Sequence, residues 1–163
     1  MKYTLIIFSL LALFIACAGE KKTDDKADST KANEETSTPA SKNPEEYDPK
    51  RGEGKWSSDN VAVGATLDAT MAAEGEKIAQ VKCASCHKLT AERLVGPGWA
   101  GVTKRRAPEW IMNFITNPDP MISKDPAVQA QLELCLVRMP NQNLADNEAR
   151  AILEFMRKND GVN

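Results

Sequence analysis

Cys83-Ala84-Ser85-Cys86-His87 lies near the middle of the 163-residue chain, and this short stretch determines which folds the rest of the sequence can adopt. It places two thiols about one helical turn apart and an imidazole directly beside the second thiol. His87 is the single histidine of the sequence, and Cys83 and Cys86 are two of its four cysteines. A metal centre with two or more histidine ligands is therefore excluded, and any metal chemistry must be built around one imidazole.

Three kinds of chemistry use a Cys-x-x-Cys pair. C-x-x-C-H is the pattern of covalent haem attachment: the two sulfurs bond the two haem vinyl groups, and the histidine reaches one face of the iron. A thioredoxin-like dithiol would follow a strand in a β-α-β unit, and no strand pattern precedes the motif. A zinc site would need a second ligand pair, for which Cys135 is the remaining soft candidate. The motif therefore favours one covalently bound haem c.

Helix start and stop signals divide the sequence after residue 68 into four helical stretches, and no convincing period-2 strand appears. The expected helices are 69–83, 108–116, 125–137 and 146–158. Pro108 occupies a favoured first helical position, and Asp125 and Asp146 are expected N-caps. Asn117-Pro118 is expected to end the second helix. The sequence thus predicts an all-α domain of about four helices over residues 69–160.

These segments resemble the monohaem class I cytochromes c of bacteria. The resemblance covers about residues 70–160 and rests on four blocks: Gly75–Lys82, Leu94–Gly101, Arg138-Met139-Pro140 and Asn143–Glu148. It implies a cytochrome c fold around one covalently attached haem, in which the first and last helices cross at Gly75. Ala79 stands where relatives often have an aromatic residue. Either the crossing is thinner here, or Tyr47 or Trp56 fills the space.

The resemblance also implies a set of site residues. Cys83 and Cys86 would hold the haem, and His87 and Met139 would be the two axial ligands of the iron. The carbonyl of Pro97 would accept a hydrogen bond from the other ring nitrogen of His87, which fixes the ring and raises its basicity.

Three further residues belong to the expected pocket. Trp99 and Trp110 would form apolar walls, although core packing alone would also explain both tryptophans. An indole N–H or the guanidinium of Arg105 would bind the haem propionates. Lys104 departs from the family here, because a glycine usually precedes this arginine.

The sixth iron ligand has to be something other than histidine. Met139 leads, because it follows a helix and comes 52 residues after His87. Met121 is the main competitor because it too lies in an expected loop, and a loop methionine can also merely fill a gap. Met112 and Met156 fall on expected helices. His/Met ligation raises the reduction potential and closes the iron to substrates, so we expect an electron carrier and not an enzyme.

Cys135 is not explained by the motif. It shares a predicted helical face with Val128, Leu132 and Met139, at steps of three and four residues. A free cysteine behaves as a small hydrophobic residue and is often buried. We therefore expect Cys135 to fill the core, with an intermolecular disulfide as the alternative.

The N-terminal region predicts export. Residues 1–16 have the charge and apolar run of a signal peptide that is too short to span a bilayer. Cys17 directly follows, as in bacterial lipoproteins, where this cysteine is lipidated; an ordinary secretory peptide is the alternative. Residues 17–46 lack the hydrophobic side chains that would offset the ordering cost of the backbone, which predicts a disordered tether. Residues 47–68 are expected to be an irregular extension.

The charge of the chain is unevenly distributed. The total is −2, which argues against a nucleic-acid binder. Residues 82–106, however, carry six basic side chains and one acidic one. This stretch would steer the protein toward an acidic redox partner, or its arginines would serve only the propionates.

The expected function is that of a lipid-anchored electron carrier on the periplasmic side of a bacterial membrane. It would link a quinol-oxidising complex or another donor to an oxidase or a periplasmic reductase. The alternatives are a dedicated haem subunit of one periplasmic oxidoreductase and, less in keeping with His/Met ligation, an open-site haem enzyme or sensor.

Overall fold

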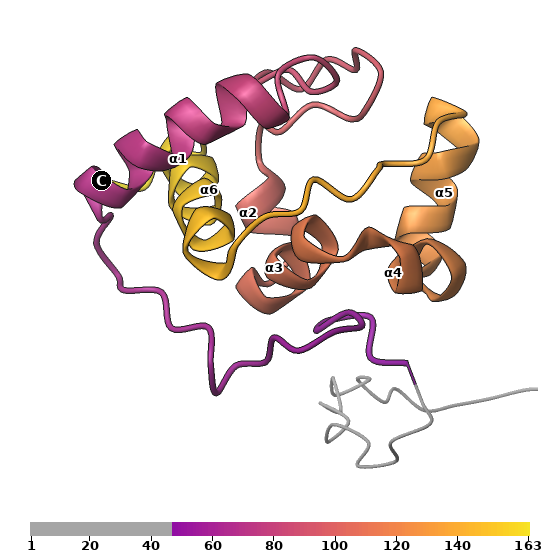
Figure 1. The fold of residues 1–163 in the computed structure, drawn as a ribbon, viewed down its shortest axis with the longest axis horizontal. Coiled ribbons are helices and arrows are strands. Elements are labelled where there is room, and N and C mark those ends of the chain that lie inside the picture. Colours follow the sequence, from indigo (N-terminus) through magenta and orange to yellow (C-terminus); the bar gives the residue numbers. More distant parts are fainter. Residues whose placement is uncertain (1–46) are drawn as a thin grey trace, which may run out of the picture. The chain divides into compact units, whose positions relative to one another are not determined.

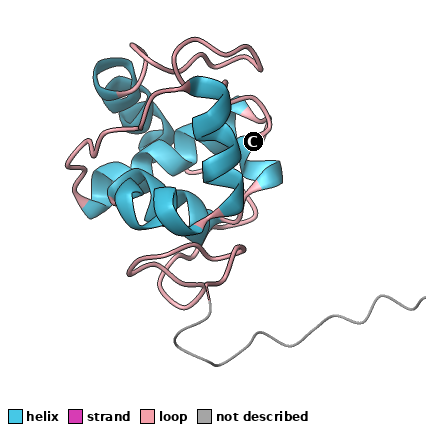
Figure 2. Cartoon of the chain, turned by 90° about the vertical axis from the view of Figure 1, so that its right-hand side faces the viewer, coloured by secondary structure: helices cyan, strands magenta, loops and turns pink. Residues whose placement is uncertain are grey.

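A computed structural model describes residues 47–163; the expected signal peptide (1–16), Cys17 and the expected tether (17–46) lie outside the described residues. Helices joined by loops make up the described part, which contains no strand (Figure 1, Figure 2). The helices are α1 (Ala69–Lys82), α2 (Val102–Arg105), α3 (Pro108–Thr116), α4 (Pro118–Lys124), α5 (Pro126–Cys135) and α6 (Asp146–Asn159). None of these helices has the length and apolar character needed to cross a membrane. The all-α class is confirmed, and the expected number of about four helices is corrected to six.

The two helices that the sequence did not predict, α2 and α4, are short and have specific local causes. Asn117-Pro118 does end α3, but Pro118 also occupies the first position of α4, where its missing N–H costs nothing. The single turn α2 follows Gly101, whose φ is 75°. The Asp160 carboxylate accepts bonds from the N–H and the hydroxyl of Thr103 at 2.8 and 2.6 Å, which stabilises this turn.

Two helix ends differ from their predicted positions. α5 ends at Cys135 and not at 137, because Leu136 adopts a left-handed conformation with φ 58°. In α6 the N-cap is Ala145 and not Asp146. The Glu148 carboxylate accepts the N–H of Ala145 at 2.9 Å, so the cap is made by a side chain one turn inside the helix.

The first and last described helices, α1 and α6, cross each other (Figure 1). A Cβ on Gly75 would lie 2.0 Å from the carbonyl oxygen of Ala151, so the two backbones approach as closely as glycine allows. The α6 face at this crossing includes the buried Ile152 and Phe155. The crossing of α1 and α6 is therefore confirmed, with Gly75 at the contact.

Residues 47–68 contain turns and no helix. Their backbone is held by the buried Asn113 of α3, whose Oδ1 accepts the N–H of Trp56 at 2.9 Å. The indole N–H of Trp56 donates to Thr116, and the Tyr47 hydroxyl donates to Asp125. Both aromatic residues therefore lie against the α3–α5 region. Trp56 also packs against the hydrophobic core that contains Ala79, and its filling of the space beside Ala79 stays a prediction.

Candidate functional site

The C-x-x-C-H motif forms a turn at the end of α1. Cys83 is the C-cap of that helix, and its carbonyl oxygen accepts the N–H groups of both Cys86 and His87 at 3.0 Å. Among the described residues, Cys83, Cys86 and Cys135 form no disulfide with one another. Cys83 is buried, and burial raises the pKa of its thiol to about 11.

The imidazole of His87 is held on one side by the segment that follows the motif. Its Nδ1 lies 2.8 Å from the carbonyl oxygen of Pro97, and its ring centroid is 5.6 Å from that of the buried Trp99. Because the Pro97 carbonyl can only accept, Nδ1 is the donor of this bond, which leaves Nε2 as the ring nitrogen that could bind a metal.

Gly96 allows this arrangement and was not identified from the sequence as a site residue. A Cβ at this position would lie 2.5 Å from Cε1 of His87. The Gly96 N–H donates to the Cys86 carbonyl at 2.8 Å, so the segment crosses directly over the imidazole. The sequence did contain a signal for Gly96: it directly precedes Pro97, the expected acceptor for His87.

A cavity of about 320 Å³ opens beside the motif, within the range of small-molecule sites. Every predicted site residue of the described chain lines it: Cys83, Cys86, His87, Pro97, Trp99, Arg105, Trp110 and Met139. Two thiols and an imidazole in mostly hydrophobic surroundings fit a covalently attached haem, and the Met139 thioether adds a candidate iron ligand. In residues 47–163, no three side chains of the His, Cys, Asp or Glu type form a group that could hold a metal ion.

The methionines separate into those that line the cavity and those that do not. Met139 and Met156 line it, whereas Met112 and Met121 are fully buried elsewhere. Met121 lies in α4 and not in a loop, and a Cβ on Gly52 would contact its Cε at 2.6 Å. The expectation that Met121 is a loop competitor was therefore wrong: it is a core residue beneath the N-terminal extension.

Trp110 differs from its expected role in one respect. Its indole N–H donates to the Asp125 carboxylate at 2.7 Å, so this N–H is not available to a propionate. Its ring forms part of the cavity wall, as expected. The guanidinium of Arg106 lies 4.7 Å from the ring centroid and also lines the cavity. Arg106 is thus a further cation at the site, beside Lys82, Arg105 and Arg138, and the sequence alone did not single it out.

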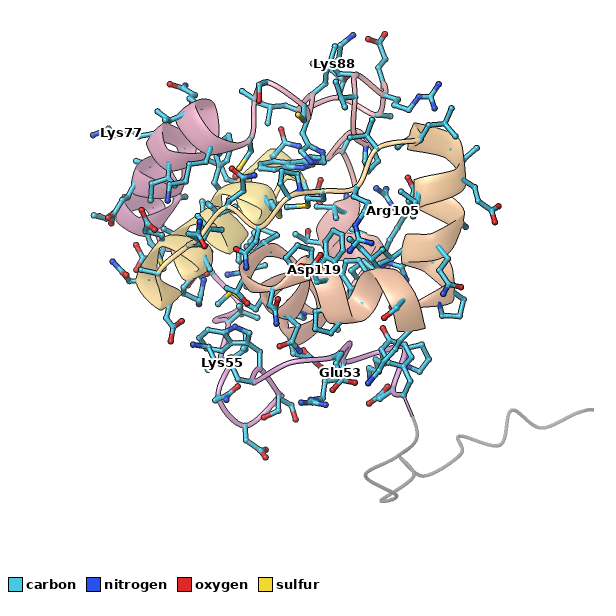
Figure 3. The ribbon with its side chains drawn as sticks, turned by 45° about the vertical axis from the view of Figure 1, so that its right-hand side comes forward. Glu53, Lys55, Lys77, Lys88, Arg105 and Asp119 are labelled. Carbon is cyan, nitrogen blue, oxygen red and sulfur yellow. The ribbon has the colours of Figure 1, made fainter. Side chains whose placement is uncertain are left out.

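Arg105 lies at the edge of the site. One nitrogen of its guanidinium donates to the Ala100 carbonyl at 2.7 Å. The guanidinium has further N–H groups that could bind a propionate. In Figure 3 Arg105 lies on the side of the molecule that faces α5, while Lys88 lies on the loop after the motif. Two other cations of this stretch are paired, Lys82 with Glu148 at 3.3 Å and Lys88 with Glu92 at 2.8 Å.

Cys135 does not fill the core. It is partly exposed and lines the cavity at the last position of α5, a helix that packs against α4. The expectation of a shared helical face with Met139 fails because the helix ends before that residue. Cys135 ends α5 and Met139 lies in the loop after it, and both residues line the same cavity.

The sequence and the structure of the chain are both similar to those of known proteins. The sequence profile described as "Cytochrome c" matches residues 72–160. The structure of cytochrome c from Rhodothermus marinus is similar, with 35% identity and a TM-score of 0.62, covering 69% of this chain and 92% of that one. An engineered variant of that cytochrome, Rma TDE, shows 34% identity and a TM-score of 0.62, covering 69% of this chain and 98% of its own.

The same engineered protein bound to a carbene intermediate shows 35% identity and a TM-score of 0.59, with coverage of 69% and 98%. No curated protein matches the sequence. The profile spans more than half of the chain, and the solved relatives are covered almost completely. The chain therefore belongs to the cytochrome c family, whose members bind haem c covalently and transfer electrons with it.

Proposed function

We propose that this protein is a one-electron carrier with a single His/Met-ligated haem. Cys83 and Cys86 would hold the haem through two thioether bonds, and His87 and Met139 would ligate its iron. The haem supplies a one-electron iron couple. The observation that carries the proposal is the 2.8 Å contact between Nδ1 of His87 and the Pro97 carbonyl, made on the wall of a cavity that Met139 also lines.

The protein contributes orientation and basicity on the histidine side. The Pro97 carbonyl fixes the His87 tautomer, so that Nε2 is the ligating nitrogen, and it strengthens that nitrogen as a donor. Trp99 lies beside the ring, tilted by 35° with a centroid distance of 5.6 Å, and Trp99 itself packs edge-on against Phe155 of α6. A ligand held in this way needs little rearrangement when the iron changes charge.

The rest of the cavity excludes water and balances charge. Trp110 is stacked on Phe114 at 5.2 Å and forms an apolar wall. Arg105 and Arg106 are the proposed partners of the haem propionates, because both residues line the cavity and a guanidinium matches a carboxylate with two parallel N–H groups. Trp110 contributes through its ring and not through its N–H.

Replacement of Met139 by alanine tests the ligation. The Met139→Ala holoprotein should lose the weak red-edge absorption band that the family resemblance associates with sulfur ligation, and its ferrous form should bind carbon monoxide rapidly. Met121→Leu is the matched control, because Met121 is equally a methionine but lies away from the cavity. An unchanged band in Met139→Ala, or its loss in Met121→Leu, would refute the assignment. Rapid carbon monoxide binding by the wild-type protein would favour the open-site alternative.

The proposed partners are a quinol-oxidising complex or another donor, and an oxidase or periplasmic reductase as acceptor. The basic stretch at residues 82–106 supports an acidic docking partner, since exposed opposite charges speed encounter more than they tighten a complex. A rate of reduction by the partner that does not change with ionic strength would argue against this docking mode. A dedicated subunit of one enzyme would instead stay bound at high salt.

We further propose that the mature protein is anchored on the periplasmic side of a bacterial membrane through lipidated Cys17. The apolar run before Cys17 supports this proposal. Cys17→Ser should release the haem protein from the membrane fraction, whereas Cys135→Ser should not. Retention of Cys17→Ser in the membrane fraction would contradict the anchor.

A further inference from the structure

Asp125 is a buried carboxylate that the haem site does not explain. Its residue is 1% exposed, and it is the N-cap of α5. One of its oxygens accepts the N–H groups of Ala127 and Val128 at 2.8 and 3.1 Å. The other accepts the indole N–H of Trp110 at 2.7 Å and the hydroxyl of Tyr47. Capping a helix needs only the first pair of bonds.

The donors around this carboxylate include residues of the cavity wall. Trp110, Ala127 and Val128 all line the cavity and all donate to Asp125. The carboxylate therefore lies directly behind one wall of the proposed haem pocket. Tyr47 closes the opposite side, so the N-terminal extension covers the carboxylate.

The carboxylate retains its charge. Burial alone would raise its pKa, but the bonds from Tyr47, Trp110 and the N–H groups of Val128 and Ala127 outweigh burial and lower the pKa below its usual value. Among residues 47–163, no lysine or arginine forms an ion pair with Asp125. Arg106 lies over the same indole but is partly exposed, so its charge is more strongly screened.

We propose that Asp125 is a positioning residue for the redox chemistry: a fixed negative charge behind the Trp110 wall that stabilises ferric haem and lowers the reduction potential. The inference rests on the proposed function, because it requires the haem to occupy this cavity. Reduction adds one electron and converts ferric to ferrous iron, so the oxidised cofactor carries one more positive charge. A nearby fixed anion favours the more positive state.

The size of the effect follows from Coulomb's law. Two unit charges on the order of 10 Å apart, at an effective dielectric constant of about 20, change an equilibrium constant roughly tenfold or slightly more. Removing the charge should therefore shift the reduction equilibrium about tenfold toward the ferrous state. For one electron this corresponds to a rise of about 59 mV in the reduction potential.

A redox titration of the Asp125→Asn holoprotein tests the proposal. Asparagine is as good an N-cap as aspartate and has nearly the same shape. The direction of the change also distinguishes an effect of the Asp125 charge from a purely structural effect of the substitution. Loss of the charge should raise the reduction potential. A loosened wall would admit water, which stabilises the more highly charged ferric state and lowers the potential. An unchanged or lowered potential in Asp125→Asn would overturn the proposal.

Two further variants keep the test informative if Asp125→Asn does not fold. Asp125→Ser is a second neutral N-cap and should also raise the potential. Tyr47→Phe keeps the charge but removes a hydroxyl dipole that offsets it, so the potential should fall slightly. A higher potential in Tyr47→Phe would contradict the proposal. If the wild-type protein carried no covalent haem, or lacked the weak red-edge absorption band of sulfur ligation, the proposed function would be refuted instead.

Discussion

At the scale of single residues, the C-x-x-C-H motif predicted most of the site because its chemistry is local. Two thiols and an imidazole within five residues define haem attachment, and the family resemblance added Pro97 and Met139. Gly96 was missed because its importance depends on a contact with His87 across the loop, 2.5 Å from a hypothetical Cβ. Sequence periodicity carries no information about such a contact.

The Gly96→Ala variant tests that contact. The added methyl group would overlap the imidazole, so either His87 or the loop must move, and overpacking of this kind costs typically about 1–3 kcal/mol. Urea unfolding of the holoprotein should show this loss. Gly64→Ala is the control, because its Cβ would meet nothing closer than 3.5 Å, and it should change stability by less than about 0.5 kcal/mol. Equal stability of the two variants would contradict the proposed loop–imidazole contact.

At the scale of helices, the sequence predicted the longer elements and failed at the short ones. α1, α3 and α6 have clear start and stop signals, and their observed bounds differ from expectation by one residue at most. α2 and α4 are only four and seven residues long and are stabilised by contacts distant in the sequence, such as Asp160 with Thr103. Proline was correctly interpreted as a helix stop, but its equal suitability as a helix start was overlooked at Pro118.

The crossing of α1 and α6 yields a prediction at this scale. Glycine-to-alanine exchange in an exposed helix stabilises by about 1 kcal/mol. At Gly75 the same change should destabilise the protein instead, by about 1–3 kcal/mol, because the Cβ would meet the Ala151 carbonyl at 2.0 Å. Gln80→Ala, on the exposed face of α1, should be nearly neutral. Thermal unfolding of the two holoproteins measures the difference, and a stabilised Gly75→Ala would show that the helices do not meet there.

At the scale of the whole molecule, the fold class, the family and the haem could be predicted, whereas the surroundings of the cavity could not. Arg106 and Asp125 both contact Trp110. The guanidinium of Arg106 lies over the indole ring, and the carboxylate of Asp125 accepts the indole N–H. The sequence showed Tyr47 only as a hydrophobic residue of an irregular segment, yet its hydroxyl reaches Asp125 across 78 positions of the chain. Long-range polar contacts of this kind become visible only when the chain is folded.

Peptide mapping of the purified holoprotein by mass spectrometry tests directly whether one haem is attached through Cys83 and Cys86. One peptide should carry one haem, bonded through both Cys83 and Cys86, and the peptide that contains Cys135 should carry none. Each of Cys83→Ala and Cys86→Ala should reduce attachment to a single thioether or abolish it. Haem that is released intact by acidic organic solvent from the wild-type protein, or that is found on Cys135, would contradict the account.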